Sequence, residues 1–348
     1  MKDGGSSLEK EARFRNKITW FSTVFSVMVV WVHSANGELF LGQSEAARKV
    51  AAFERFLGFT IGQMAVPGFF MMSGYLFYRG FRWEKLGEKW NSRIRSVLVP
   101  FLMWNGIYYL GYVIGSRLPV VTDIMAKGKV PFDWYTAVEA VLHYSYHYVF
   151  WYLYQLIQLI LLAPVLYGIL RQPATGAAWL AVCFWGTLRG VTIPHLNLDA
   201  LFYYSLAAFG GLHGRALVEG DWTVRRCRTG AALVAAAAAI LMARWPGGIG
   251  EGVLMRTMGP LGLWLMTDES RLPVSREWMR YNFYLYTIHF ALVRLLNKTA
   301  ARFFSGFWPL PVILYLLMPM FMIAVSTVSG SWLKRHVPKT WFLLNGGR

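Results

Sequence analysis

The segment ITWFSTVFSVMVVWVHS, residues 18–34, decides the fold class of this chain. It is uncharged and mostly apolar, and it comes close to the roughly 20 residues that a helix needs to cross the hydrocarbon core of a bilayer. A polar, charged segment precedes it up to Lys17. No small-residue cleavage site follows it, so we do not expect its removal as a signal peptide. The segment predicts a first transmembrane helix that stays in the mature protein.

Similar runs recur along the chain, in which 56% of the residues are hydrophobic, 17% aromatic and only 15% charged. This composition lies outside the range of ordinary soluble domains. We therefore predict an all-α, polytopic transmembrane helical bundle of about ten spans, forming a single domain over residues 1–348 with cytosolic segments at 1–17 and 334–348. The strong candidates are 18–34, 56–78, 96–115, 148–170 and 303–333; the shorter ones are 174–188, 200–212, 229–243, 253–267 and 281–293.

The net charge of +17 has a topological explanation, because the basic residues fall between the apolar runs. Lys and Arg are enriched in cytosolic loops of membrane proteins. That bias predicts that both termini are cytosolic, and it gives no reason to expect nucleic acid as a partner. The basic residues after the second and sixth spans form the two largest clusters: Arg79, Arg82, Lys85, Lys89, Arg93 and Arg95, and Arg215, Arg225, Arg226 and Arg228.

Few residues in the predicted spans can carry chemistry. Cys183 and Cys227 offer neither a disulfide framework nor metal-ligand spacing, so we expect no metal site and no tightly bound cofactor. Ionisable residues inside spans are costly and tend to be functional, which singles out His33, His289 and Arg256.

His33 has two interpretations. A neutral imidazole at the outer end of the first span can take a proton from a hydroxyl group. Alternatively, it is a histidine at a helix end that bonds a neighbouring backbone group or interfacial water. No acidic residue within a span is an obvious partner to orient it; Glu38, Glu139 and Asp199 in external segments are the nearest candidates.

Five segments resemble, in order and spacing, those of the acyltransferase 3 family. They are VVWVHS (29–34), AVPGFFMMSGYL (65–76), RIRSVLVPFLMWN (93–105), WYL with LLAP (151–153 and 161–164) and YTIH (286–289). The resemblance implies a ten-span O-acyltransferase that moves an acetyl or other acyl group from coenzyme A to the hydroxyl of an external glycan, lipid or peptide. Acyl-CoA is then the donor substrate, and the protein contacts membrane lipids.

The resemblance also implies that the protein resides in a bacterial inner membrane, and it gives a role to His33; the other candidates rest on the chemistry of their side chains. His33 corresponds to the family's presumed general base. His289, Trp151, Ser73 and Asn105 are candidates for lining the acceptor site or channel, in a cavity between the first, second and ninth spans. Ser73–Gly74 has an alternative role that we favour, close helix packing. Arg forks match phosphate oxygens, which makes Arg79, Arg82, Arg93 and Arg95 candidates for donor binding, although each could serve topology alone.

Two departures from the family pattern leave alternatives open. Ser22 stands where the family has an arginine eleven residues before the histidine, and Tyr154–Gln155 replaces an Arg–Asp pair. The chain is then an acyltransferase with altered donor binding or acceptor, or an inactive member. A transporter or flippase for a glycan or lipid, without group transfer, is the other class of function. The acceptor, the acyl chain length and the oligomeric state are not set by the sequence.

Overall fold

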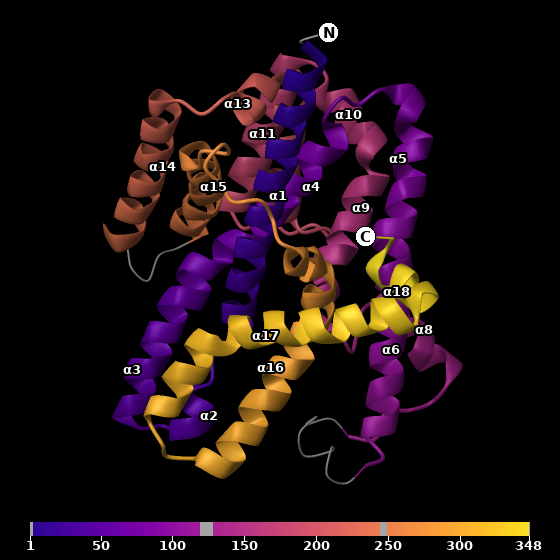
Figure 1. Ribbon diagram of the computed structural model, residues 1–348, viewed down its shortest axis with the longest axis vertical. Helices are drawn as coiled ribbons and strands as arrows, with labels where there is room; N and C mark the ends of the chain where they lie inside the picture. The colour runs from indigo at the N-terminus through magenta and orange to yellow at the C-terminus, as the bar shows by residue number, and fades with distance from the viewer. Residues whose placement is uncertain (1–2, 119–127, 244–248, 348) are drawn as a thin grey trace. The chain divides into compact units, whose positions relative to one another are not determined.

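The computed structural model describes residues 3–118, 128–243 and 249–347, and no strand forms among them (Figure 1). The predicted all-α, polytopic class is confirmed, and a helix lies at each of the ten predicted positions. Five helical segments are long and apolar enough to cross a membrane, and a bent pair makes a sixth. They are Leu8–Leu41, Glu45–Tyr78, Trp83–Gly115, Val224–Ala243 and Pro309–His336, with the pair Tyr148–Leu161 and Ala163–Leu170. The count of ten spans and the cytosolic termini stay predictions.

Two predicted spans have different boundaries in the structure. The run 148–170 bends by 62° after Leu161, where Pro164 lies in the first turn of the second helix and lacks the N–H that would continue the first. The run 303–333 is broken at its start, because Gly306 has φ +83°. That left-handed conformation suits glycine and ends a helix.

The described chain divides into two compact units. Unit 1 comprises the described residues within 1–29, 60–86 and 161–279, and unit 2 comprises those within 30–59, 87–160 and 280–348. The first helix, α1 (Asp3–His33), contributes to both. The other unit 1 helices are α4 (Ala65–Tyr78), α10 (Ala163–Leu170), α11 (Pro173–Leu188), α12 (Leu198–His213), α13 (Arg215–Glu219), α14 (Val224–Ala243) and α15 (Ile249–Met266), with short turns at Gly62–Met64 and Trp83–Lys85.

Unit 1 is built on close helix pairs. Gly74 of α4 faces the Tyr204 carbonyl of α12, and a Cβ at this glycine would lie 2.3 Å from that oxygen. The predicted packing role of the Ser73–Gly74 segment is confirmed at Gly74. Gly230 and Gly262 permit a similar approach of α14 and α15, which lie side by side (Figure 1). Small residues let two backbones come this close.

Unit 2 contains the end of α1 and the helices that surround it. These are α2 (Gly37–Leu41), α3 (Glu45–Glu54), α5 (Leu86–Arg93), α6 (Val99–Gly115), α8 (Trp134–Leu142), α9 (Trp151–Leu161), α16 (Asn282–Phe304), α17 (Pro309–His336) and α18 (Pro338–Asn345). Shorter turns lie at Ile94–Leu98 and Tyr148–Phe150, and two more, Arg55–Ile61 and Glu277–Tyr281, contain residues of both units.

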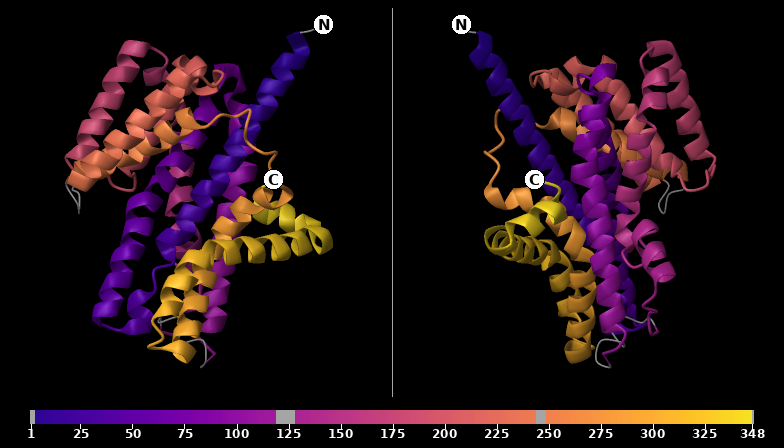
Figure 2. Two further views of the ribbon diagram at one scale, coloured as in Figure 1. Left: turned by 60° about the vertical axis from the view of Figure 1, so that its left-hand side comes forward. Right: turned by 90° about the vertical axis from the view of Figure 1, so that its right-hand side faces the viewer.

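The core of unit 2 forms where α1 ends against α16 and α17. Val30, Leu285, Val293, Met318 and Met322 are buried together there. The long helix α17 changes direction along its length (Figure 2), and Pro319 inside it supplies the cause.

The segment expected as a C-terminal tail is folded over most of its length. Residues 334–336 belong to α17, and the following α18 packs against α6 and α17. Trp104 of α6 donates a hydrogen bond from Nε1 to the Leu344 carbonyl at 3.0 Å. Residues 1–2 and 348 of the two predicted terminal segments lie outside the described residues.

Candidate functional site

His33 is the last residue of α1, and three aromatic rings surround its imidazole in unit 2. The ring centroid of Phe290 lies 5.2 Å away, that of His289 5.4 Å and that of Tyr148 6.5 Å. His33 is partly buried, and its side chain forms no hydrogen bond or ion pair with another described residue. The two histidines that the sequence singled out, from the first and the ninth predicted spans, are therefore neighbours.

A network of hydrogen bonds holds the backbone that follows His33. The Glu54 carboxylate accepts hydrogen bonds from the backbone N–H groups of Asn36, at 3.0 Å, and Gly37, at 3.2 Å. Asn297 of α16 accepts from the Asn36 side chain at 3.1 Å and donates to the Ser34 carbonyl at 3.2 Å. The turn after His33 is thus fixed at both of its ends.

Sequence reasoning missed Glu54, which is only 3% exposed although its side chain is a carboxyl group. A signal was present, because a glutamate shortly before the apolar run 56–78 must find donors or water when it enters a helix bundle. Sequence offers no means of saying that its donors are the amides that start α2.

The YTIH segment on α16 also binds the neighbouring turn of unit 2. Tyr286 donates a hydrogen bond to the Val149 carbonyl at 2.6 Å, and the Thr287 carbonyl lies 3.0 Å from Nε2 of His147. His147 is fully buried and stacks on Tyr108, with ring centroids 3.8 Å apart. His147 lies beyond the end of α8 at Leu142.

The remaining candidates for lining the acceptor site are distributed over both units. Asn105 is buried in unit 2; its amide donates to the Phe101 carbonyl of its own helix at 2.9 Å, while its Oδ1 is buried without a partner in the described chain. Trp151 begins α9 in the same unit and is partly buried. Ser73 lies on α4 of unit 1. The predicted cavity between the first, second and ninth spans stays a prediction.

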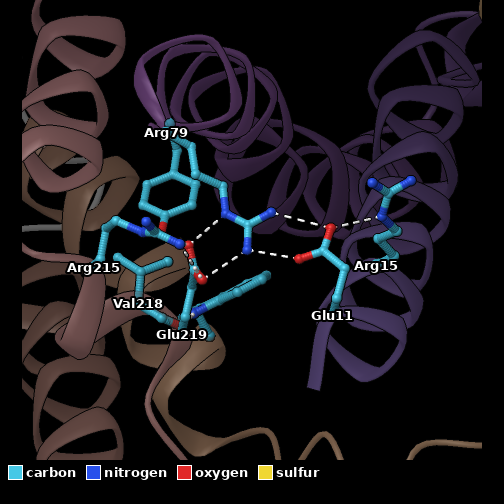
Figure 3. A network of polar contacts seen from close by, with 8 residues as sticks. Glu11, Arg15, Arg79, Arg215, Val218 and Glu219 are labelled. Carbon is cyan, nitrogen blue, oxygen red and sulfur yellow. Dashed lines mark hydrogen bonds and ion pairs between the residues drawn. The ribbon is translucent and has the colours of Figure 1, made fainter. Parts of the chain in front are cut away.

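Arg79 differs from the other predicted donor-binding residues, because two carboxylates already occupy its guanidinium (Figure 3). It binds Glu219 through Nε at 2.6 Å and Glu11 through Nη2 at 2.7 Å. Arg15 pairs with Glu11, and Arg215 and the Tyr75 hydroxyl bond Glu219. The network joins α1, α4 and α13 within unit 1.

The network sets the charge state of Glu219. Burial raises the pKa of this carboxyl, but hydrogen bonds from Arg79, Tyr75 and Arg215 outweigh burial and hold the pKa at about 2. Because the folded-state pKa is below the ordinary value, the contribution of Glu219 to stability is present at neutral pH and is lost as the pH falls toward 2.

The other three arginines form no ion pair with a described residue. Arg82 lies in the turn after α4 and is exposed, Arg93 ends α5 and is partly buried, and Arg95 is exposed in the following turn. These cations are open to a ligand with phosphate groups, whereas Arg79 has its counter-ions within the protein.

The structure also shows what surrounds the departures from the family pattern. Ser22 lies on α1 in unit 1, next to an apolar cluster built on Phe21 and Phe25, with its hydroxyl 3.9 Å from the Met72 sulfur.

Asp199, one candidate partner for His33, pairs with Arg256 at 3.2 Å. Glu139, another candidate, pairs with His143.

Comparison with known proteins agrees with these motifs. Residues 16–333, which include segments of both units, match the family described as an acyltransferase domain. The succinoglycan biosynthesis protein ExoH of Rhizobium meliloti (strain 1021) is 25% identical over 309 residues, which cover 84% of this chain and 81% of that protein. No solved structure matches the chain. With the family match extending over most of its length, and with His33 and His289 meeting at the end of the first helix, this helical membrane protein belongs to the acyltransferase 3 family.

Proposed function

We propose that this protein O-acylates an extracytoplasmic polysaccharide, taking an acetyl or another acyl group from cytosolic acyl-CoA. Family membership supports the acyltransferase class, and the name of its relative ExoH links that protein to the biosynthesis of succinoglycan, a polysaccharide. A single observation carries the proposal. The His33 imidazole is held at the end of α1 beside His289, and it forms no hydrogen bond with a described residue.

The proposed reaction uses His33 as the general base. The acceptor oxygen attacks the thioester carbonyl carbon while His33 takes the hydroxyl proton. The tetrahedral intermediate then collapses, the carbon–sulfur bond breaks, and His33 returns the proton to the departing thiolate. The products are the acyl ester and free coenzyme A, and His33 is neutral again. A hydroxyl group is a poor nucleophile at neutral pH, which is why the base is needed.

Reconstituted protein tests the proposal directly. Proteoliposomes supplied with radiolabelled acetyl-CoA and de-esterified polysaccharide are expected to produce labelled polysaccharide from which mild alkali releases acetate, because oxygen esters are alkali-labile. Liposomes without protein provide the control. Movement of polysaccharide across the bilayer that is independent of acyl-CoA, with no label incorporated, would instead establish a transporter.

Donor binding is expected to depend on the unpaired arginines. Replacing Arg93 and Arg95 together by glutamine removes two cations that can bond coenzyme A phosphates, so acyl-CoA affinity should fall about tenfold. The affinity of the parent should also decline more steeply with ionic strength. Isothermal titration with a non-hydrolysable acyl-CoA analogue measures both effects.

Arg79→Gln provides the contrast for that experiment. It leaves Glu11 and Glu219 without their shared counter-ion, so we expect a loss of about 2 kcal/mol in stability, seen as a lower unfolding temperature in detergent.

Unchanged donor affinity in the Arg93/Arg95 variant, with correct insertion, would mean that those arginines serve topology only.

A further inference from the structure

His289 has one ring nitrogen engaged and one free. Its Nδ1 lies 2.8 Å from the Tyr286 carbonyl and 3.3 Å from the Leu285 carbonyl. Carbonyl oxygens only accept hydrogen bonds, so Nδ1 must carry the hydrogen. The Nε2 atom is buried and has no partner among the described residues, and His289 as a whole is 0% exposed.

The neutral form of His289 is the one that this environment favours. A second proton on Nε2 would place a charge and an unpaired donor in a site with no carboxylate bonded to the ring, and burying an unpaired charge is unfavourable. Nε2 therefore presents a lone pair. A buried acceptor without a donor is uncommon in native structures and calls for an explanation, of which a catalytic role is one.

The imidazole of His33 is a polar ring that lies beside His289. A hydrogen bond of about 3 Å between the edges of two imidazoles puts their centroids about 5 Å apart, and the observed separation is 5.4 Å with the rings inclined by 44°. The spacing of the two rings therefore matches that of an edge-to-edge hydrogen bond from a His33 N–H to Nε2. The other two neighbours of His33, Phe290 and Tyr148, contact its ring edge-on and constrain its orientation.

We propose that His289 positions His33 by accepting a hydrogen bond at Nε2 from the His33 ring. The two histidines then form a dyad in which His289 takes the place that a carboxylate holds in a catalytic triad. With one His33 nitrogen committed as the donor, its other nitrogen has a lone pair to receive the hydroxyl proton. When His33 becomes an imidazolium, the same bond to Nε2 stabilises the new charge. This proposal rests on the proposed function for its kinetic consequence, but not for the hydrogen bond itself.

Glutamine and methionine at position 289 test the dyad as a matched pair, because they are similar in shape and only glutamine keeps a strong acceptor, the methionine sulfur being a weak one. The readout that needs no activity is ¹⁵N nuclear magnetic resonance of histidine-labelled protein in liposomes. In the parent and in His289→Gln, the His33 ring should show one dominant tautomer; in His289→Met it should show a mixture of both. His213, whose Nε2 lies 2.8 Å from the Leu170 carbonyl in unit 1, offers a control in His213→Met, which should leave the His33 signals unchanged.

Kinetics give the second readout. His289→Met is expected to lower kcat about 100-fold with the KM for acyl-CoA within about twofold, and His289→Gln to recover most of that loss, since the defect lies in the base and not in donor binding. If methionine at this site prevents insertion, the shorter pair His289→Asn and His289→Leu repeats the comparison.

The outcomes separate the two proposals. An unchanged His33 tautomer in His289→Met would overturn the dyad, as would a rise in the acceptor KM alone, which would assign His289 to acceptor binding. If the parent protein transfers no acyl group, but the His33 tautomer still differs between the parent and His289→Met as predicted, the proposed function is refuted and the dyad stands.

Discussion

His33→Ala is expected to abolish acyl transfer, lowering kcat by about 100- to 10,000-fold, the usual contribution of a positioned general base. The ring lies at the end of α1 and packs against three other rings without bonding any described residue, so its loss removes a proton acceptor and few stabilising contacts. The effect should therefore fall on turnover, while acyl-CoA affinity and membrane insertion change little.

The measurement compares initial rates of label transfer to polysaccharide with analogue binding by titration in the same preparations. His213→Ala serves as the control for loss of a histidine, because His213 bonds a backbone carbonyl in unit 1 and has no part in the proposed chemistry. A folded His33→Ala protein that retains turnover within a few-fold of the parent would refute the mechanism. His289 would then become the candidate base.

Glu54→Ala is expected to destabilise the protein by about 3 kcal/mol and to reduce transfer in parallel. The substitution leaves the N–H groups of Asn36 and Gly37 buried without an acceptor, and each unsatisfied group costs about 1–3 kcal/mol. Because those groups belong to the turn that follows His33, the turn should loosen and His33 should lose its position. Glu54→Gln keeps one acceptor oxygen and should lose less.

A second glutamate on the same helix gives the matched control. Glu45 begins α3 and is exposed, and in the described part of the chain its ion pair is with Lys49, one turn later. Exposed pairs of this kind contribute little, so Glu45→Ala should leave both the unfolding temperature and the transfer rate unchanged. Equal behaviour of the two variants would show that the carboxylate of Glu54 does not hold the turn.

The helices of this protein were predictable from its sequence. Backbone N–H and C=O groups in a bilayer must form their hydrogen bonds within their own segment. Long apolar runs such as 18–34 and 96–115 are therefore expected to form helices. The breaks after Leu161 and at Gly306 escaped prediction, because hydropathy registers length and polarity and is insensitive to where a proline or a left-handed glycine interrupts an apolar run.

The candidate site was predictable only in part. Motifs in the sequence singled out His33 and His289, and the structure shows that their rings are neighbours in unit 2. They did not indicate Glu54 or His147, since each is buried through partners distant in the chain. The sequence also gave Arg79 the same expected role as Arg93 and Arg95, whereas its ion pairs with Glu11 and Glu219 distinguish it.

By itself, then, the sequence determined the all-α membrane class, the positions of the helices and the family. The tertiary structure decided which polar side chains meet: His33 with His289, Glu54 with the turn after His33, and Arg79 with two carboxylates. The physical reason is that hydrophobicity and helix geometry act over neighbouring residues and are legible in any short window. Hydrogen bonds and ion pairs act over a few ångströms in space. Only the packing of whole helices brings the two bonding groups within that range.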